Sequence, residues 1–294
     1  MARLAAVELG GTNALVALGE GTKIIEQAAF KVAGPDATLA QIAAQLARWN
    51  EQQPVEALGI ASFGPIRVNP AASDHGRMLP TPKAGWSGAD VLGPLAAAVA
   101  GPAVLQTDVT AAALAEGRWG AAQGCSDHLY ITIGTGVGVG IVAGGRPVIG
   151  RMHPEGGHLR IRRAPNDDFA GSCPYHGDCL EGLISGPALA ARVGCDPASL
   201  PNEHPVWAPF VDALAEACAD LLLLLATERI VVGGGVIRSR PELLMDAAKR
   251  CSDKLAGYLP FVDGLGPIVP AALENAGLAG ALHLAEQKLS DRYC

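Results

Sequence analysis

A short run of cysteine and histidine residues has the spacing of a metal site. Two residues separate Cys173 from His176, and two more separate His176 from Cys179. This spacing lets one tight loop present neighbouring ligands to a tetrahedral ion, with His158 or His153 available as the fourth. Four protein ligands leave no open coordination position, so a zinc ion bound here would be structural. The alternative is a chance cluster that binds no metal.

Three clusters of glycine could hold phosphate. Each follows a short apolar run, and they lie at residues 10–11, 134–140 and 233–235. An apolar run that meets glycines is typical of a strand ending in a tight turn, where the backbone can approach a ligand closely. The N–H groups of such turns can bind phosphate together with hydroxyls such as those of Thr12 and Thr135. The offsets match neither a Walker A loop nor a dinucleotide fingerprint, and ordinary hairpin turns are the alternative.

Asp108 is the candidate general base. It follows the strand-like run 104–107 and precedes a helical segment expected at 109–118. A carboxylate at the C-terminal end of a strand lies where open α/β sheets bind their ligands. In phosphoryl transfer such a carboxylate can accept the proton of the attacking hydroxyl. The alternative is that Asp108 caps the N-terminus of the helix, and the two roles are compatible.

Taken in chain order, these motifs resemble the ROK family of bacterial sugar kinases and related repressors. The resemblance extends from about residue 3 to about residue 286 and rests on Asp108 and on the segments 8–12, 133–138 and 232–235. Its most specific part is Glu155-Gly156-Gly157-His158, followed by C-P-Y-H-G-D-C-L-E at 173–181. This second element is similar to the fructokinase branch of the family. Of the two candidate fourth ligands, the resemblance selects His158.

The resemblance implies a fold and an activity. The fold is the α/β, two-lobed actin/hexokinase-like ATPase fold, a duplicated ribonuclease-H-like unit with a zinc-binding loop. The activity is ATP-dependent phosphorylation of a hexose at its 6-hydroxyl, with fructose as the expected sugar, and ATP, Mg²⁺ and a structural Zn²⁺ as cofactors. A glucokinase, an N-acetylmannosamine kinase and a catalytically silent sugar sensor are the alternatives. The family also implies a homodimer.

The resemblance also assigns roles to individual residues. Asp108 is the general base. The residues assigned to the sugar are Glu155, Glu181, Thr107 and Gly64. The residues assigned to ATP are Gly10, Gly11, Thr12, Gly134, Thr135, Gly136, Pro187, Gly233, Gly234, Gly235 and Val236. The residues assigned to zinc are His158, Cys173, His176 and Cys179.

Three residues differ from the commonest family pattern. Glu8 replaces an aspartate, Asn13 a lysine, and Thr107 the asparagine that normally precedes the catalytic aspartate. Glu8 keeps the charge on a longer side chain near the expected phosphate region. Thr107 keeps a hydroxyl but loses an amide that would bond the sugar. Downstream, Ser185 is expected to cap a helix whose N-terminus at Gly186 could face the nucleotide.

Composition supports a globular protein. The 294 residues are 49% hydrophobic and 17% charged, which is enough to bury a sizeable core. The net charge of −7 and the absence of a Lys/Arg run argue against a nucleic-acid partner. A repressor would need a helix-turn-helix before the first glycine turn, and only about eight residues precede it. No apolar run is long enough to span a membrane, and seven scattered cysteines favour a reducing cytoplasm.

The repeated strand–glycine turn–strand pattern predicts two α/β lobes. The first is expected at 1–115, joined by a C-terminal helix at 275–288. The second is expected at 116–274 and contains the zinc loop 158–181.

Overall fold

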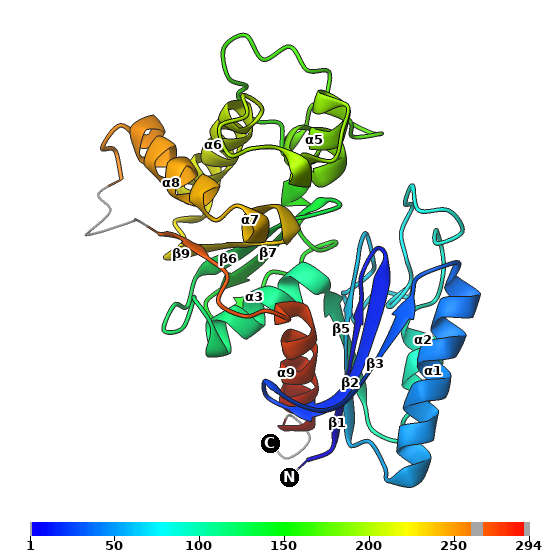
Figure 1. Ribbon diagram of the computed structural model, residues 1–294. Coiled ribbons are helices and arrows are strands. Elements are labelled where there is room, and N and C mark those ends of the chain that lie inside the picture. The colour runs from blue at the N-terminus through cyan, green and yellow to red at the C-terminus, as the bar shows by residue number, and fades with distance from the viewer. Residues whose placement is uncertain (1, 260–266, 291–294) are drawn as a thin grey trace. The chain divides into compact units, whose positions relative to one another are not determined.

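The computed structural model describes residues 2–259 and 267–290, and its chain forms two compact units (Figure 1). The first unit contains the chain up to Trp119, the segment Pro147–Pro154 and the chain from Leu273 onward. The second contains Gly120–Arg146 and Glu155–Ala272. Within the described residues, no helix has both the length and the apolar character that crossing a bilayer requires.

The first unit is built on a five-stranded sheet with the order β3-β2-β1-β4-β5. Its strands are β1 (Leu4–Leu9), β2 (Asn13–Glu20), β3 (Lys23–Lys31), β4 (Ala57–Ser62) and β5 (Ala103–Thr107). β1 pairs antiparallel with β2 and parallel with β4, which continues parallel to β5. Every residue of β4 is buried, as expected for a central strand with both faces covered by helices.

Helices cover both faces of this first sheet (Figure 1). They are α1 (Pro35–Gln52), α2 (Leu92–Ala96), α3 (Asp108–Trp119) and α9 (Ala276–Ser290). Glycine allows α9 to pack very closely. A Cβ at Gly59 of β4 would overlap the carbonyl oxygen of Ala281, and a Cβ at Gly280 would overlap that of Ala111 in α3. The C-terminal helix is therefore part of the first unit.

The second unit repeats the same arrangement. Its sheet has the order β10-β9-β6-β7-β8. The strands are β6 (His128–Ile133), β7 (Val137–Ala143), β8 (Arg146–Pro147), β9 (Arg229–Gly233) and β10 (Ile268–Pro270). β6 pairs antiparallel with β7 and parallel with β9, so β6 and β9 correspond to β1 and β4. The two units thus share one strand order, which agrees with the duplicated α/β unit that the sequence pattern predicts.

Helices of the second unit form its core with the sheet. They are α4 (Leu180–Ile184), α5 (Gly186–Val193), α6 (Trp207–Leu225), α7 (Gly235–Ser239) and α8 (Glu242–Leu255), with short 3-10 turns at Gly156–His158 and Pro197–Ser199. The apolar faces of α6 and α8 pack together with the residues of β6 and β9. Because this core is extensive, the loops that follow β6 and β9 start from rigid strands.

Candidate active site

Asp108 lies where β5 ends and α3 begins, and it is partly exposed. Its Oδ1 accepts a 2.8 Å hydrogen bond from the N–H of Val109. A helix N-terminus is a favourable position for a negatively charged side chain. Asp108 therefore lies at the C-terminal end of a strand, as the sequence predicts.

Thr107, and not Asp108, caps helix α3. The Thr107 Oγ1 accepts a 3.2 Å hydrogen bond from the N–H of Thr110 and donates one of 2.7 Å to the Thr110 Oγ1. The suggested capping role of Asp108 is therefore wrong, because the helix begins one residue earlier than the segment 109–118. Thr107 is 2% exposed, and its hydroxyl already donates a hydrogen bond to Thr110. Its predicted contact with sugar stays a prediction.

The first glycine turn connects β1 to β2. The N–H of Gly10 donates to the carbonyl of Asn13 over 3.0 Å, and residues 11–13 are exposed. Gly64 lies beside this turn, because its neighbour Phe63 donates its N–H to the carbonyl of Leu9 over 2.7 Å. The predicted phosphate residues 10–12 and the predicted sugar residue Gly64 are thus together in the first unit.

Lys83 is a residue of this region that sequence reasoning missed. Its Nζ donates to the carbonyl oxygen of Gly11 and lies 5.1 Å from the centre of the Phe63 ring. Partial burial lowers the pKa of Lys83 from its ordinary value. No pattern in the sequence could have found it, because 72 residues separate it from Gly11.

In the second unit, the turn after β6 holds Glu181. The Glu181 Oε2 accepts a 3.0 Å hydrogen bond from the N–H of Val137, the first residue of β7. A Cβ at Gly136 would lie 2.7 Å from the same oxygen. Gly136, predicted to contact ATP, therefore lies beside a predicted sugar ligand. Its contact with nucleotide stays a prediction.

Glu155 lies near Glu181 at the start of a 3-10 turn. Its backbone carbonyl accepts the N–H of His158 over 3.0 Å, and Gly157 packs closely enough on β7 that a Cβ would overlap the Val137 carbonyl. Burial raises the pKa of Glu155 to about 7, and the negative charge of Glu181 adds to this shift. Two carboxylates are thus held close to each other within one unit.

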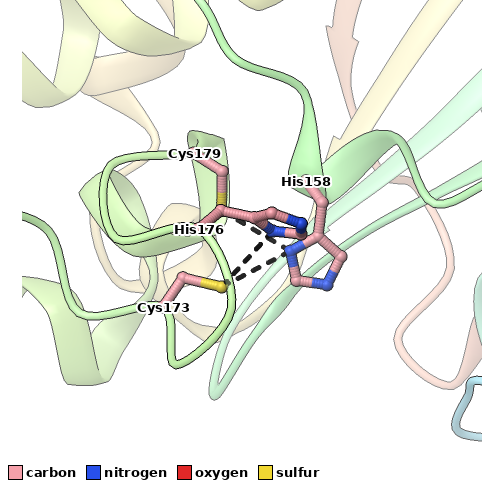
Figure 2. Close-up of side chains that lie close together, drawn as sticks. All are labelled: His158, Cys173, His176 and Cys179. Atoms are coloured by element: carbon pink, nitrogen blue, oxygen red, sulfur yellow. Dashed lines mark hydrogen bonds between the residues drawn. The ribbon is translucent and has the colours of Figure 1, made fainter. Parts of the chain in front are cut away.

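The four predicted zinc ligands lie together (Figure 2). Their donor atoms are all within 4.8 Å of one another. The His158 Nδ1 is 3.5 Å from the Cys179 Sγ and 3.7 Å from the Cys173 Sγ, which is also 3.7 Å from the His176 Nδ1. Zinc bonded to sulfur at about 2.3 Å and to nitrogen at about 2.0 Å, with tetrahedral angles, would separate these atoms by roughly 3.5 Å. The cluster therefore fits a zinc ion.

His153, the competing ligand, does not belong to the cluster. It lies in the first unit, where its Nε2 accepts a 3.1 Å hydrogen bond from the N–H of Ile66. The structure therefore agrees with the choice of His158. The loop itself is closed by paired backbone hydrogen bonds of 2.9 and 3.1 Å between Cys173 and Gly177, so the ligands are held near one another by the backbone.

A pocket of about 580 Å³ opens in the second unit beside the turn after β6. Five of the residues predicted for ATP line it: Gly134, Thr135, Pro187, Gly235 and Val236. The other lining residues are Gly186, Ala190, Asp196, Pro197, Ala198, Trp207 and Ser239, of which the sequence indicated only the helix start at Gly186. The pocket is mostly apolar, with backbone at one end, which suits a planar base and its attached phosphates.

Two observations explain how the pocket is formed. Ser185 caps α5 as predicted, because its side chain accepts the N–H of Ala188 over 3.3 Å. The N–H of Gly186 donates to the carbonyl of Gly134 over 2.7 Å, so the glycine turn and the start of α5 form one surface. Gly233 and Gly234 do not line the pocket, and a Cβ at Gly234 would overlap the backbone of Ile133.

Comparison with known proteins decides the family. The model of the ROK family matches residues 4–288. The chain belongs to the ROK family. It is 38% identical to a fructokinase of Pediococcus pentosaceus, over 98% of this chain and 99% of that protein. It is also 38% identical to a fructokinase of Zymomonas mobilis, over 77% of this chain and 76% of that protein.

A solved ROK structure confirms the fold. A ROK family glucokinase from Streptomyces griseus, in complex with glucose and AMPPNP, superposes with a TM-score of 0.74. The two sequences are 26% identical, and the match covers 97% of this chain and 99% of the glucokinase chain. The predicted α/β fold of two equivalent units is therefore confirmed. The fructokinases of Pediococcus pentosaceus and Zymomonas mobilis confirm the resemblance to the fructokinase branch of the ROK family. Membership of this family, together with these relatives, supports a sugar kinase.

Proposed function

We propose that this ROK protein is an ATP-dependent fructokinase that phosphorylates the 6-hydroxyl of fructose. The observation that carries the proposal is its 38% identity, over nearly the full length of both chains, to a protein named fructokinase. Two features of the second unit support it. The paired carboxylates of Glu155 and Glu181 suit sugar hydroxyls, and the apolar pocket suits a nucleotide base.

In this proposal Asp108 is the catalytic residue. Its carboxylate accepts the proton of the 6-hydroxyl while the sugar oxygen forms a bond to the γ-phosphorus of ATP. The bond from that phosphorus to the bridging oxygen breaks, and ADP leaves with the electron pair. The position of Asp108 at the N-terminus of α3 supports this role, because the helix stabilises its ionised form at the start of the reaction.

ATP is expected to use both glycine turns. The base would lie between Ala198 and Trp207 of the apolar pocket, with the N–H groups near Thr135 and Val236 directed at phosphate. The turn at 10–12 would contact the phosphate that is transferred. Mg²⁺ would accompany the nucleotide and supply positive charge between its phosphates. A carboxylate such as that of Glu8 is a suitable ligand for it.

Glu155 and Glu181 are proposed to bind the sugar. A carboxyl group can form hydrogen bonds with two sugar hydroxyls, and these bonds are short and charge-assisted when the group is ionised. Glu155 precedes the metal ligand His158 by three residues, and Glu181 follows Cys179 by two. A structural zinc ion at His158, Cys173, His176 and Cys179 would therefore hold both carboxylates in place. Zinc would supply no chemistry to the reaction, because all four of its positions are taken by protein.

A coupled assay for ADP production tests the proposal. Fructose, glucose, mannose and N-acetylmannosamine would be compared at equal concentrations, and the position of the phosphate would be read by NMR. Fructose is expected to give the highest kcat/KM, with the phosphate on O6. A kcat/KM for glucose about tenfold above that for fructose would instead indicate a glucokinase. Binding of sugar with no turnover of any of the four would indicate a sugar sensor.

A further inference from the structure

Lys83 lies on a loop between β4 and α2 that is firmly anchored. Trp86 is fully buried, donates its indole N–H to the carbonyl of Ala33 over 3.0 Å, and packs edge-on against Phe63. Thr81 and Ser87 close the loop, because the Thr81 N–H donates to the Ser87 Oγ over 3.1 Å and this hydroxyl donates to the Thr81 carbonyl over 3.2 Å. The position of Lys83 is thus set by the fold.

The ammonium group of Lys83 is directed at the first glycine turn. It donates to the carbonyl of Gly11 and lies over the ring of Phe63. Among residues 2–259 and 267–290, no carboxylate forms an ion pair with it. An ammonium carries three donors, and one carbonyl uses one of them. Two donors and a full positive charge therefore stay available beside an exposed turn.

The turn itself provides no charge to bind an anion. Residues 10–12 offer backbone N–H groups and one hydroxyl, and Asn13 is neutral. A phosphate with two or more negative charges gains more from an ammonium than from neutral donors, and lysine is a common phosphate ligand. If the side chain at position 83 served only to hold the turn, a neutral hydrogen-bond donor would be enough, because the acceptor is the neutral carbonyl of Gly11.

We propose that Lys83 binds the phosphoryl group that is transferred, and that it completes the first glycine turn as an anion site. This inference rests on the proposed kinase activity. While the sugar oxygen bonds to the phosphorus and the bond to ADP breaks, the ammonium stabilises the negative charge on the phosphoryl oxygens. Lys83 keeps its three protons throughout, since the hydroxyl proton goes to Asp108. After transfer, the ammonium contacts the phosphate of the product.

The product gives a direct test, because it differs from the substrate by the phosphate alone. Affinities for fructose and for fructose 6-phosphate would be measured by calorimetry on the wild type, Lys83→Met and Lys83→Arg. Lys83→Met is expected to lose roughly tenfold to hundredfold in affinity for fructose 6-phosphate, as for a hydrogen bond to a charged group. Its affinity for fructose should stay within about twofold, and its kcat should fall by a factor similar to the loss in product affinity. Lys83→Arg should recover most of the product affinity, since it keeps the charge.

Lys23→Met is the matched control. Lys23 begins β3 in the same unit, at the end of the β2–β3 hairpin that lies away from the turn at 10–12, so it should change neither affinity. Equal losses for fructose and fructose 6-phosphate in Lys83→Met, or no loss for either, would overturn the inference. So would a loss in Lys83→Arg as large as in Lys83→Met, because charge would then be irrelevant.

The wild type separates this inference from the proposed function. A wild-type protein that phosphorylates no sugar contradicts the proposed function. An active wild type whose Lys83→Met variant keeps its kcat and its affinity for fructose 6-phosphate contradicts the inference about Lys83 alone. Melting temperatures of all variants would identify any change that comes from loss of folding.

Discussion

The backbone N–H of Val137 donates a 3.0 Å hydrogen bond to the Oε2 of Glu181. This bond connects the turn after β6, which was expected to serve the nucleotide, to a carboxylate that is proposed to bind the sugar. The same turn begins at Gly134, which lines the pocket proposed for ATP. One short segment therefore has a nucleotide side and a sugar side, and its glycines can be assigned to one side or the other by mutation.

Gly136→Ala is expected to raise the KM for fructose and to leave the KM for ATP nearly unchanged. The added methyl group would lie 2.7 Å from the Glu181 Oε2, so this carboxylate must move. We expect an increase of roughly tenfold, the value of a charge-assisted hydrogen bond. Gly134→Ala is the matched control, because its Cβ meets no atom within 4 Å and should leave the KM for fructose unchanged. If Gly136→Ala raised the KM for ATP more than the KM for fructose, Gly136 would instead be assigned to nucleotide binding.

Asp108→Asn is expected to lower kcat by about 10²–10⁴, the usual contribution of a positioned general base. Calorimetry should show ATP and fructose binding close to that of the wild type. The free energy of unfolding should barely change, because Thr107 and not Asp108 caps α3. Turnover equal to the wild type would exclude Asp108 as the base.

Thr107→Ala is the complementary variant and should act on stability first. It removes the oxygen that accepts the Thr110 N–H and also the donor to the Thr110 hydroxyl. Loss of such a cap costs about 1 kcal/mol in the free energy of unfolding. Chemical denaturation of Thr107→Ala and Asp108→Asn, side by side, measures the difference. If Asp108→Asn were the less stable of the two, the capping assignment would be reversed.

Cys179→Ser tests the metal cluster. The wild type is expected to contain one zinc ion per chain by elemental analysis, and the variant much less. Because Glu181 lies two residues from Cys179, the variant should also bind fructose more weakly, while the pocket proposed for ATP keeps its affinity. Cys125→Ser is the control, since Cys125 is not a member of the cluster. Fully active wild-type enzyme with less than about a tenth of an equivalent of zinc would contradict this role.

Local signals in the sequence were sufficient for the two α/β units and for part of the site. The apolar runs and glycine turns predicted both α/β units. Ser185 was identified as a cap because serine is a preferred N-cap residue and proline is favoured in the first turn of a helix. The cap of α3 was placed one residue too late, because threonine and aspartate are both good caps and sequence does not set the first turn of a helix.

The choice between His153 and His158 shows where local signals end. Both precede the loop at similar distances, and the reason that His153 is excluded is a hydrogen bond from Ile66, 87 residues away. The walls of the proposed nucleotide pocket were missed for the same reason. Pro197, Ala198 and Trp207 belong to ordinary turn and helix patterns, and tertiary packing alone brings them beside the glycine turn.

Arg240 is the residue that holds these walls in place. It is 7% exposed and lies directly after α7, whose first residues line the pocket. Its guanidinium donates to the carbonyl of Pro197 over 3.2 Å and to that of Leu200, and it lies 4.6 Å from the centre of the Trp207 ring. One planar group thus fixes a turn, an aromatic ring and the end of α7 at the same time.

Arg240→Lys is therefore expected to raise the KM for ATP by roughly tenfold while the KM for fructose stays within about twofold. Lysine keeps the charge but lacks the planar fork, so it cannot bond two carbonyls and stack on Trp207 together. Arg229→Lys is the matched control, because that guanidinium donates to the carbonyl of Ala121 and does not line the pocket. Steady-state kinetics and melting temperatures of both variants provide the comparison. If Arg240→Lys lowered the melting temperature as Arg229→Lys does but left both KM values unchanged, Arg240 would stabilise the fold without positioning the nucleotide.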